Sequence, residues 1–208
     1  MPRRHPPRRT ASPTADAARQ DLRIIGGEWR SRKLPFPAIE GLRPTPDRVR
    51  ETVFNWLQFH VGGAHCLDLF AGSGALGLEA LSRGAAHTTF VDQAAAATSQ
   101  LKRNLTTLKC QKAEVIQMDA ALFADQLLGK EGVQYDLVFL DPPFNKGLVE
   151  PICKALEASG QLSDHALIYI ETESTVGHLN LPEHWRALKE KRAGQVLYRI
   201  YEREIREL

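Results

Sequence analysis

The residues best suited to chemistry stand at the end of an apolar run, in the order Asp141, Pro142, Pro143 and Phe144. Each proline lacks an N–H group and holds the residue before it in an extended conformation. The Asp141 carboxylate and the Pro142 carbonyl are therefore a pair of hydrogen-bond acceptors with no neighbouring donor. Such a pair suits an aromatic amine, which presents two N–H donors. The alternative is an ordinary turn with Phe144 in the core, since Asp-Pro is common where loops start.

Methyl transfer to the amine of a nucleobase is the chemistry that this surface favours. The exocyclic amine is a poor nucleophile because its lone pair is delocalised into the ring. Acceptors on both N–H groups favour a pyramidal nitrogen, and they stabilise the positive charge that grows on it during transfer. Asp141 is placed to take the proton, and Phe144 offers a face for stacking that is worth about 1–3 kcal/mol. We expect the base to be unpaired or extruded when it binds.

A glycine-rich loop precedes this edge in the chain, within DLFAGSGALGLEA. Gly72, Gly74 and Gly77 satisfy the GxGxxG pattern, and Asp92 ends the next strand-like run about 20 residues further on. The pattern alone admits NAD, FAD and S-adenosylmethionine, and a glycine turn without a ligand is a further alternative. Asp68 favours S-adenosylmethionine, because a carboxylate there can receive the methionine ammonium but would repel the pyrophosphate of a nicotinamide cofactor.

Strand-like and helical segments alternate from residue 64 onward and position both motifs. The strand-like runs are short and continuously apolar, which is typical of strands covered on both faces; they are 65–70, 88–92, 113–117, 135–140 and 166–171. The helical segments span 75–83, 95–108, 120–129 and 147–158. This alternation predicts a doubly wound α/β fold with a mostly parallel sheet and right-handed crossovers. Residues 185–204 alternate in polarity around Gly194 and predict an antiparallel hairpin at one side of the sheet.

A small basic module precedes the α/β core. Residues 23–37 carry Gly26-Gly27 between strand-like residues, which predicts a hairpin or a short β appendage. A helix follows within 43–57, with Thr45 as its expected N-cap and Pro46 at the first helical position. Its apolar face is expected to be Val49, Val53, Trp56 and Leu57. Residues 1–21 are rich in arginine and proline and are expected to form a disordered basic tail.

The composition limits the class of protein. The 208 residues are 43% hydrophobic and 25% charged, with a net charge of +2, as in a soluble globular domain. No stretch approaches the roughly 18 apolar residues of a membrane span, and no signal sequence follows the N-terminal arginines, so we expect a cytoplasmic protein without membrane contact. Cys66, Cys110 and Cys153 show neither disulfide nor metal-ligand spacing, so we expect reduced thiols and no metal.

The two motifs resemble those of known methyltransferases. FAGSG is similar to motif I of the class I methyltransferases. DPPF belongs to the [DNS]-P-P-[FYW] group that N6-adenine, N4-cytosine and guanine-N2 methyltransferases share. Three further stretches make the resemblance specific: RIIGGEWRSRKLPFP, GLRPTPDRVRETVFNWL and AGQVLYRIYERE. With them the chain, from residue 23 to about 204, resembles the RsmD family, which methylates N2 of guanine 966 in 16S ribosomal RNA.

The resemblance implies a seven-stranded, Rossmann-like methyltransferase sheet and S-adenosylmethionine as the cofactor. It places Asp68, Gly72 and Gly74 at the methionine end of the cofactor, and it makes Phe70 and Ala71 cofactor-binding residues of the same loop. It places Asp92 at the ribose and Asp141 to Phe144 at the target base. Asp119 would accept from the adenine amine, and it is equally well explained as the N-cap of helix 120–129. Many relatives carry a second polar or acidic residue shortly after the ribose acid, whereas this chain has Gln93 and Ala94. The resemblance therefore does not assign the ribose and adenine contacts just past Asp92.

The implied substrate is 16S ribosomal RNA in the assembled or assembling 30S subunit. An RNA-contacting extension over 22–60 would precede a catalytic domain over 61–208. Basic residues of this extension are expected to contact phosphates: Arg23, Arg30, Arg32, Lys33, Arg43, Arg48 and Arg50. The alternative is a solvated helix face with ion pairs such as Asp47 to Arg50. Two other functions stay open, an adenine-N6 methyltransferase acting on DNA or RNA and a non-catalytic assembly factor that binds S-adenosylmethionine.

Overall fold

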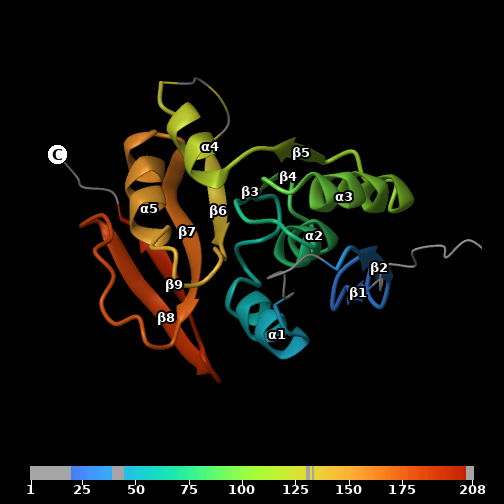
Figure 1. Cartoon of the computed structure of the whole chain (residues 1–208), viewed down its shortest axis with the longest axis horizontal. Helices are drawn as coiled ribbons and strands as arrows, with labels where there is room; N and C mark the ends of the chain where they lie inside the picture. Colours follow the sequence, from blue (N-terminus) through green and yellow to red (C-terminus); the bar gives the residue numbers. More distant parts are fainter. Residues whose placement is uncertain (1–19, 39–44, 130–131, 133, 205–208) are drawn as a thin grey trace, which may run out of the picture.

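The computed structural model describes residues 20–38, 45–129, 132 and 134–204, and its centre is a seven-stranded sheet (Figure 1). The strands run in the order β5-β4-β3-β6-β7-β9-β8. Their bounds are β3 His65–Asp68, β4 His87–Asp92, β5 Ala113–Gln117, β6 Tyr135–Leu140, β7 Leu162–Glu173, β8 Trp185–Ala193 and β9 Val196–Arg203. Strands β3 to β7 pair in parallel, and β9 and β8 are antiparallel. The predicted doubly wound α/β fold with a C-terminal hairpin is confirmed.

The helices follow the predicted segments, with differences at their ends. They are α1 Asp47–Trp56, α2 Ala75–Ser82, α3 Ala95–Thr107, α4 Ala120–Gln126 and α5 Val149–Ala158. The fourth helix stops before the predicted residue 129, where Gly129 takes a left-handed φ of 68° that turns the chain. Strand β7 is longer than the predicted 166–171 at both ends, because Tyr135 of β6 pairs with Leu162 and Val196 of β9 pairs with Glu173.

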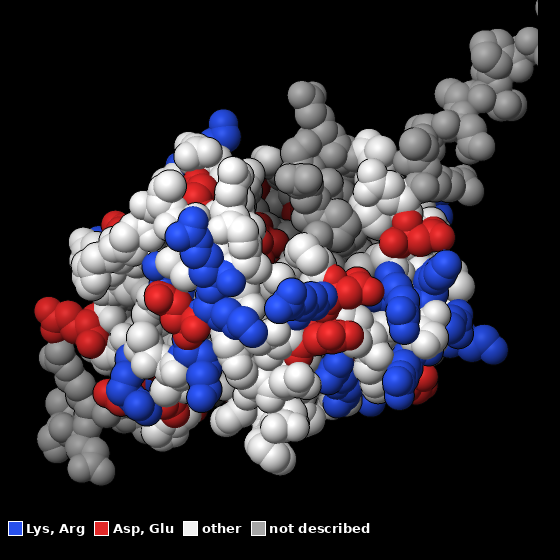
Figure 2. Space-filling model, turned by 90° about the horizontal axis from the view of Figure 1, so that it is seen from below, with Lys and Arg blue, Asp and Glu red and all other residues white. Residues whose placement is uncertain are grey.

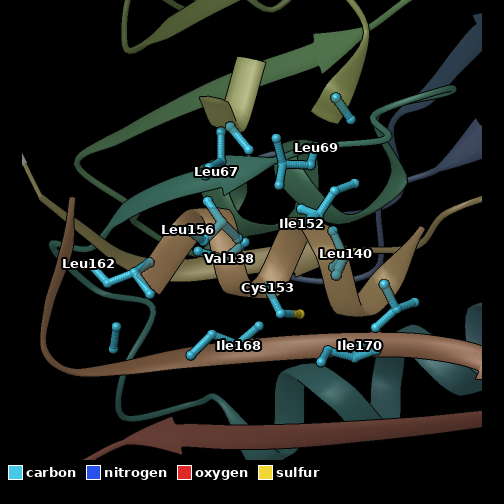
Figure 3. Close-up of a cluster of buried hydrophobic side chains, with 14 of the residues drawn as sticks. Leu67, Leu69, Val138, Leu140, Ile152, Cys153, Leu156, Leu162, Ile168 and Ile170 are labelled. Atoms are coloured by element: carbon cyan, nitrogen blue, oxygen red, sulfur yellow. The ribbon is translucent and has the colours of Figure 1, made fainter. Parts of the chain in front are cut away.

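Two apolar layers cover the sheet and explain its continuous apolar strands. On one face, α4 and α5 pack on alternate residues of the central strands, and Figure 3 shows Ile152, Cys153 and Leu156 of α5 against Val138 and Ile168. The other face buries the intervening residues under α1 and α2, in the cluster that contains Val53, Phe54, Leu76, Phe139, Tyr169 and Tyr198. Burial of a Leu or Phe side chain contributes about 1.5–3 kcal/mol. The central strands β3, β4, β6 and β7 are therefore held from both sides, and their ends are fixed in position.

The N-terminal module is a two-stranded antiparallel hairpin packed beside α2 and α3. Strand β1 (Gln20–Arg23) pairs with β2 (Lys33–Phe36), and the loop between them lies against the C-terminal end of α2. The expected β appendage is present, and Gly26-Gly27 lies in the loop between its two strands. Gly27 has a φ of 75°, and a Cβ added to it would lie 1.8 Å from the Ser82 carbonyl oxygen. The glycines therefore permit close contact with the core.

A buried carboxylate fastens this module to the α/β core. Glu79 of α2 is 0% exposed and accepts hydrogen bonds of 2.8 Å from the N–H groups of Ile25 and Gly26. Its charge is balanced by Arg83, at 2.7 Å, and by Arg50 of α1, at 3.6 Å. A buried charge is tolerated only when it is paired and hydrogen-bonded, so these partners stabilise one another. The hairpin, α1 and α2 thus meet at one side chain.

Helix α1 begins one residue later than predicted and without the predicted cap. Pro46 is the N-cap residue, no side-chain hydrogen bond caps the helix, and the first helical residue is Asp47. Thr45 was expected to be the N-cap, and that expectation is wrong, because its hydroxyl points away to the end of β6. Of the apolar face, Val49, Val53 and Leu57 are buried as expected.

Two expectations fall on residues that the structure does not describe. The expected tail over 1–21 lies outside the described residues up to position 19, and β1 begins at Gln20. Arg43 also lies outside them. Among the described helices, none is long and apolar enough to cross a membrane.

Candidate active site at the carboxyl edge of the sheet

The candidate site lies where the sheet changes its direction of growth. From β3 the chain proceeds to β4 and β5 on one side, and from β6 to β7 on the other, while β3 and β6 are neighbours. Open α/β sheets bind ligands outside the carboxyl ends of the strands at such a point. Asp68 ends β3, and Asp141 follows the last residue of β6. The carboxyl ends of β6 and β7 point to the side on which α1 lies (Figure 1).

The loop after β6 holds Pro143 and Phe144 open to solvent. Pro142 is buried, whereas Pro143 is exposed and Phe144 is 37% exposed, so the alternative in which Phe144 belongs to the core is not what the structure has. Asn145 follows with a left-handed φ of 59°, and its N–H group donates to the Glu173 carboxylate. The loop and the residues after β7 line a cavity of about 390 Å³ that includes Pro142, Pro143 and Phe144. Small-molecule sites have volumes of about 300–1,000 Å³.

Asp141 is connected to the N-terminal module. The Thr45 hydroxyl donates to Asp141 Oδ2 over 3.4 Å, a long hydrogen bond between residues far apart in the chain. Thr45 itself is 5% exposed and lies just before α1. The first turn of α1 is therefore positioned against the corner that carries Asp141.

Three carboxyl groups gather at this corner: Asp68, Asp141 and Glu171. Burial raises the pKa of Asp68 to about 7, although the Gly77 N–H group, at 3.0 Å, opposes the shift. Burial, and then the charges of Glu171 and Asp68, raise the pKa of Asp141 well above its usual value. Burial also raises the pKa of Glu171. Within the described residues, no Lys, Arg or His forms an ion pair with any of the three. This corner therefore attracts hydrogen-bond donors and positive charge.

The glycine loop is braced by Asp92. Asp92 Oδ2 accepts from the Gly72 N–H group and Oδ1 accepts from the Ala94 N–H group, each at 2.8 Å. Each carboxylate oxygen has a second lone pair, so Asp92 can still accept from two ribose hydroxyls. Gly72 and Gly74 have φ values of 51° and 80°, which favour glycine. The loop thus keeps backbone N–H groups and a carboxylate at the edge of β3 and β4.

Close packing explains the other glycines of the pattern. A Cβ on Gly74 would lie 2.7 Å from Leu101 of α3, and one on Gly77 would lie 2.3 Å from the Phe90 ring of β4. Ala71 is 5% exposed and Phe70 is half-buried, so both are held by the core beside the loop. The predicted cofactor residues at the ends of β3 and β4 therefore come together around one loop.

Asp119 lies one strand further along the same edge. Its Oδ1 accepts from the N–H groups of Ala121 and Leu122 at 3.0 and 3.1 Å, so it is the N-cap of α4. The N-cap explanation is confirmed, and the side chain is also exposed at the carboxyl edge. Both roles remain compatible with the geometry, because capping uses only Oδ1.

Most of the predicted phosphate-binding residues are exposed, with one exception. Exposed positions are Arg23, Arg30, Arg32, Lys33 and Arg48. Arg50 is 1% exposed and donates to the Thr45 carbonyl, the Arg23 carbonyl and Asp47, so phosphate contact by Arg50 is wrong. The i,i+3 ion pair of Arg50 with Asp47 is the alternative that holds. Figure 2, seen from the side of α1, shows Lys and Arg gathered at the end that carries the β1–β2 hairpin, and a second group mixed with acidic side chains left of centre.

Known proteins match this chain over nearly its whole length. The family model described as "Conserved hypothetical protein 95" matches residues 22–202. The Ribosomal RNA small subunit methyltransferase D of Escherichia coli K12 is 52% identical over 183 residues, which cover 88% of this chain and 90% of the relative. This chain belongs to the family of the Ribosomal RNA small subunit methyltransferase D proteins. Its relative of the same name in Haemophilus influenzae is 49% identical and covers 89% of this chain and 95% of the relative.

The family fold is also that of a solved relative. The structure of the Escherichia coli protein yhhF has a TM-score of 0.81 at 49% identity, covering 89% of this chain and 99% of that one. The predicted membership of the RsmD family and the predicted Rossmann-like sheet are thus confirmed.

Two site residues escaped the reasoning from sequence. Thr45 has the position of a helix cap in the sequence, and only the fold brings it to Asp141. Glu171 carried a weaker signal, an acid at the end of the strand that follows the DPPF strand in IYIETE. Because parallel neighbours end at the same edge of a sheet, that acid belongs beside Asp141.

Proposed function

We propose that this member of the family transfers a methyl group from S-adenosylmethionine to the exocyclic N2 amine of a guanine in small-subunit ribosomal RNA, of the guanine-966 type in 16S RNA. One observation carries the proposal: the acceptor residues Asp141 and Pro142 directly follow β6, and β6 is the neighbour of β3, which the glycine loop follows. The relatives named as small-subunit ribosomal RNA methyltransferases support the class of substrate.

The residues at the glycine loop fit S-adenosylmethionine. When bound, this cofactor supplies an electrophilic methyl group on a positively charged sulfur. The buried Asp68 carboxyl would receive the methionine ammonium, which compensates the unpaired charge at the end of β3. Asp92 would accept from the ribose hydroxyls, and Asp119 from the adenine amine through its Oδ2. Gly72 and Gly74 let the backbone approach the ligand where a side chain would obstruct it.

The residues after β6 hold and activate the amine. The Asp141 carboxylate and the Pro142 carbonyl accept its two N–H groups, and the half-exposed Phe144 ring stacks on the base. The bound cofactor would supply its methyl group to the N2 lone pair and would leave as the thioether, and Asp141 would take the proton from the nitrogen. A carboxylate beside the nitrogen stabilises the positive charge that develops there. The raised pKa of Asp141 makes it a better proton acceptor once the base has displaced water.

The hairpin module supplies cations for the RNA backbone. Arg30, Arg32 and Lys33 are exposed on the loop and on β2, away from the buried Glu79 contacts. Cations of this kind contribute affinity that is independent of sequence and falls with salt. We propose that they orient a small-subunit particle so that one unpaired guanine reaches the Asp141 corner.

Nucleoside analysis tests the proposal directly. Small subunits from cells that lack this activity are incubated with S-adenosylmethionine carrying a labelled methyl group, and the digested RNA is examined by mass spectrometry. N2-methylguanosine is the expected product. N6-methyladenosine would favour an adenine methyltransferase instead, and cofactor binding without transfer would favour an assembly factor.

A further inference from the structure

Glu171 is a buried carboxyl group at the reacting corner that methyl transfer, as set out above, does not use. Strands β6 and β7 pair in parallel with Leu140 opposite Ile170, so Asp141 and Glu171 are the next residues on each strand and lie side by side. Glu171 is 6% exposed. By the alternation of side chains it shares the face of Tyr169, which is the face under α1. Asp141 and Glu171 therefore meet at the same end of the sheet and on the same face.

The side chain of Glu171 is held in place by a tyrosine of the same strand. The Tyr169 hydroxyl donates to Glu171 Oε2 at 2.8 Å. Tyr169 is 0% exposed, and its ring lies 6.2 Å from the Phe139 ring and 6.5 Å from the Tyr198 ring. A side chain fixed by packing and a hydrogen bond can recognise a ligand without losing further conformational freedom. Glu171 also contributes to the wall of the cavity that contains Pro142 and Phe144.

The buried Glu171 carboxyl and the half-buried Asp141 carboxyl beside it select for two adjacent donor groups on the ligand. Within the described residues neither Asp141 nor Glu171 has a cationic partner, and the two acids repel each other when both are charged. The Watson–Crick edge of guanine presents two adjacent donor groups, N1–H and the N2 amine, with the O6 acceptor beyond them. Adenine and cytosine present their amine beside an unprotonated ring nitrogen, whose lone pair would face a carboxylate oxygen.

We infer that Glu171 accepts the N1–H group of the target guanine while Asp141 and the Pro142 carbonyl hold its N2 amine, which makes Glu171 the specificity-determining residue of the site. This inference rests on the proposed guanine-N2 function and goes beyond it, because it names the group that rejects adenine and cytosine. A buried polar group left facing the wrong ligand edge is the strongest form of rejection available to a binding site.

Replacement of one base in the RNA tests the inference. Small subunits are reconstituted on 16S RNA that carries either guanine or 2-aminopurine at the target position, and initial methylation rates are measured at equal concentration. 2-Aminopurine keeps the 2-amino group but has an unprotonated N1. The wild-type protein should prefer guanine by at least about tenfold, the loss expected for one hydrogen bond to a charged group. In Glu171→Gln an amide N–H can donate to N1 of 2-aminopurine, so the preference should shrink by about tenfold.

A control on the same strand separates recognition from structure. In Glu173→Gln the carboxylate that holds the Asn145 N–H group is altered, and rates on both RNAs should fall by the same factor. Cofactor binding and thermal unfolding of Glu171→Gln show whether the variant is folded, and Glu171→Asp serves in its place if it is not. In Glu171→Asp the shortened carboxylate should lose rate on guanine RNA and leave the rate on 2-aminopurine RNA nearly unchanged.

Three results would overturn parts of the account, and they are distinguishable. Wild-type protein that methylates both RNAs equally would overturn the inference without reference to any variant. An unchanged preference in the folded variant would also overturn it, while leaving guanine-N2 methylation intact. No N2-methylguanosine from wild-type protein on guanine RNA would overturn the proposed function itself.

Discussion

Replacement of Asp141 by asparagine separates catalysis from folding at the candidate site. Asparagine keeps the shape of the side chain and one acceptor oxygen, but it loses the charge that would balance the positive nitrogen. Removal of one preorganised group that stabilises transition-state charge costs about 10²–10³ in kcat, or about 2.7–4 kcal/mol. We therefore expect kcat for methyl transfer to fall by that factor in Asp141→Asn, with the affinity for S-adenosylmethionine unchanged.

The structure predicts little loss of stability in the same variant. Asp141 lies beside Glu171 and Asp68, and the pKa of Asp141 is raised by burial and by these two charges. The hydrogen bond that the Thr45 hydroxyl donates to Asp141 over 3.4 Å can be kept by the amide oxygen of asparagine. Since the substitution removes repulsion, the free energy of unfolding at pH 7 should fall by less than about 1 kcal/mol, the net value of a typical hydrogen bond, or should rise.

Two measurements on the same preparation decide the matter. Single-turnover transfer of labelled methyl groups to undermethylated small subunits gives the rate, and urea denaturation gives the free energy of unfolding. Asp136→Asn is the matched control, because Asp136 lies at the opposite end of β6, where it accepts from the His65 N–H group at 2.9 Å. Its rate should equal that of the wild type. A rate above about one third of wild type for Asp141→Asn, or a loss of activity that accompanies unfolding, would refute the reasoning.

Four further predictions follow from named contacts. Asp92→Ala should weaken S-adenosylmethionine binding before it affects the chemical step, because the substitution removes the acceptor of the Gly72 N–H group. Equal affinities of the wild type and the variant for S-adenosylmethionine, measured by calorimetry, would contradict this. The pKa of Asp68 in the folded protein is raised from 3.8 to about 7, so the contribution of this group to stability falls as pH rises through that window. Asp68→Asn should therefore flatten the dependence of the unfolding free energy on pH between pH 4 and 7. An unchanged dependence would count against this assignment. Glu79→Gln should lower the free energy of unfolding, measured by denaturation, by about 3–5 kcal/mol, the usual cost of breaking a buried ion pair. In the control variant Glu28→Gln, at an exposed position, the free energy of unfolding should not change. The triple variant Arg30→Glu, Arg32→Glu and Lys33→Glu reverses three charges of the hairpin and should weaken small-subunit binding. The slope of log binding constant against log salt concentration should become shallower by about 0.7–0.9 for each lost phosphate contact. Unchanged binding and an unchanged slope would refute RNA contact there.

Reasoning from sequence succeeded where chemistry is encoded locally. Gly72 and Gly74 take left-handed φ values that favour glycine, and the residue that directly follows β6, Asp141, lies at the carboxyl edge of the sheet. The alternation of continuous apolar runs with helices was sufficient for the parallel sheet, because its central strands β3, β4, β6 and β7 are covered on both faces.

Contacts between distant segments could not be predicted in the same way. Arg50 stands among exposed arginines in the sequence, yet the Glu79 carboxylate and the Thr45 and Arg23 carbonyls take up its guanidinium. Thr45 has the type and place of an N-cap, but its hydroxyl donates to Asp141 because the hairpin module brings α1 to the edge of the sheet. In both cases the partner is supplied by the fold, and no spacing along the chain indicates it.

The structure of a complex tests the central claim most directly. The protein is bound to a small subunit that lacks the methyl group, in the presence of S-adenosylhomocysteine, and the target nucleotide is located by electron microscopy. We predict a flipped guanine stacked on Phe144, with N2 within about 2.7–3.2 Å of both the Asp141 carboxylate and the Pro142 carbonyl. A guanine bound elsewhere, or a base whose amine faces away from Asp141, would contradict the account.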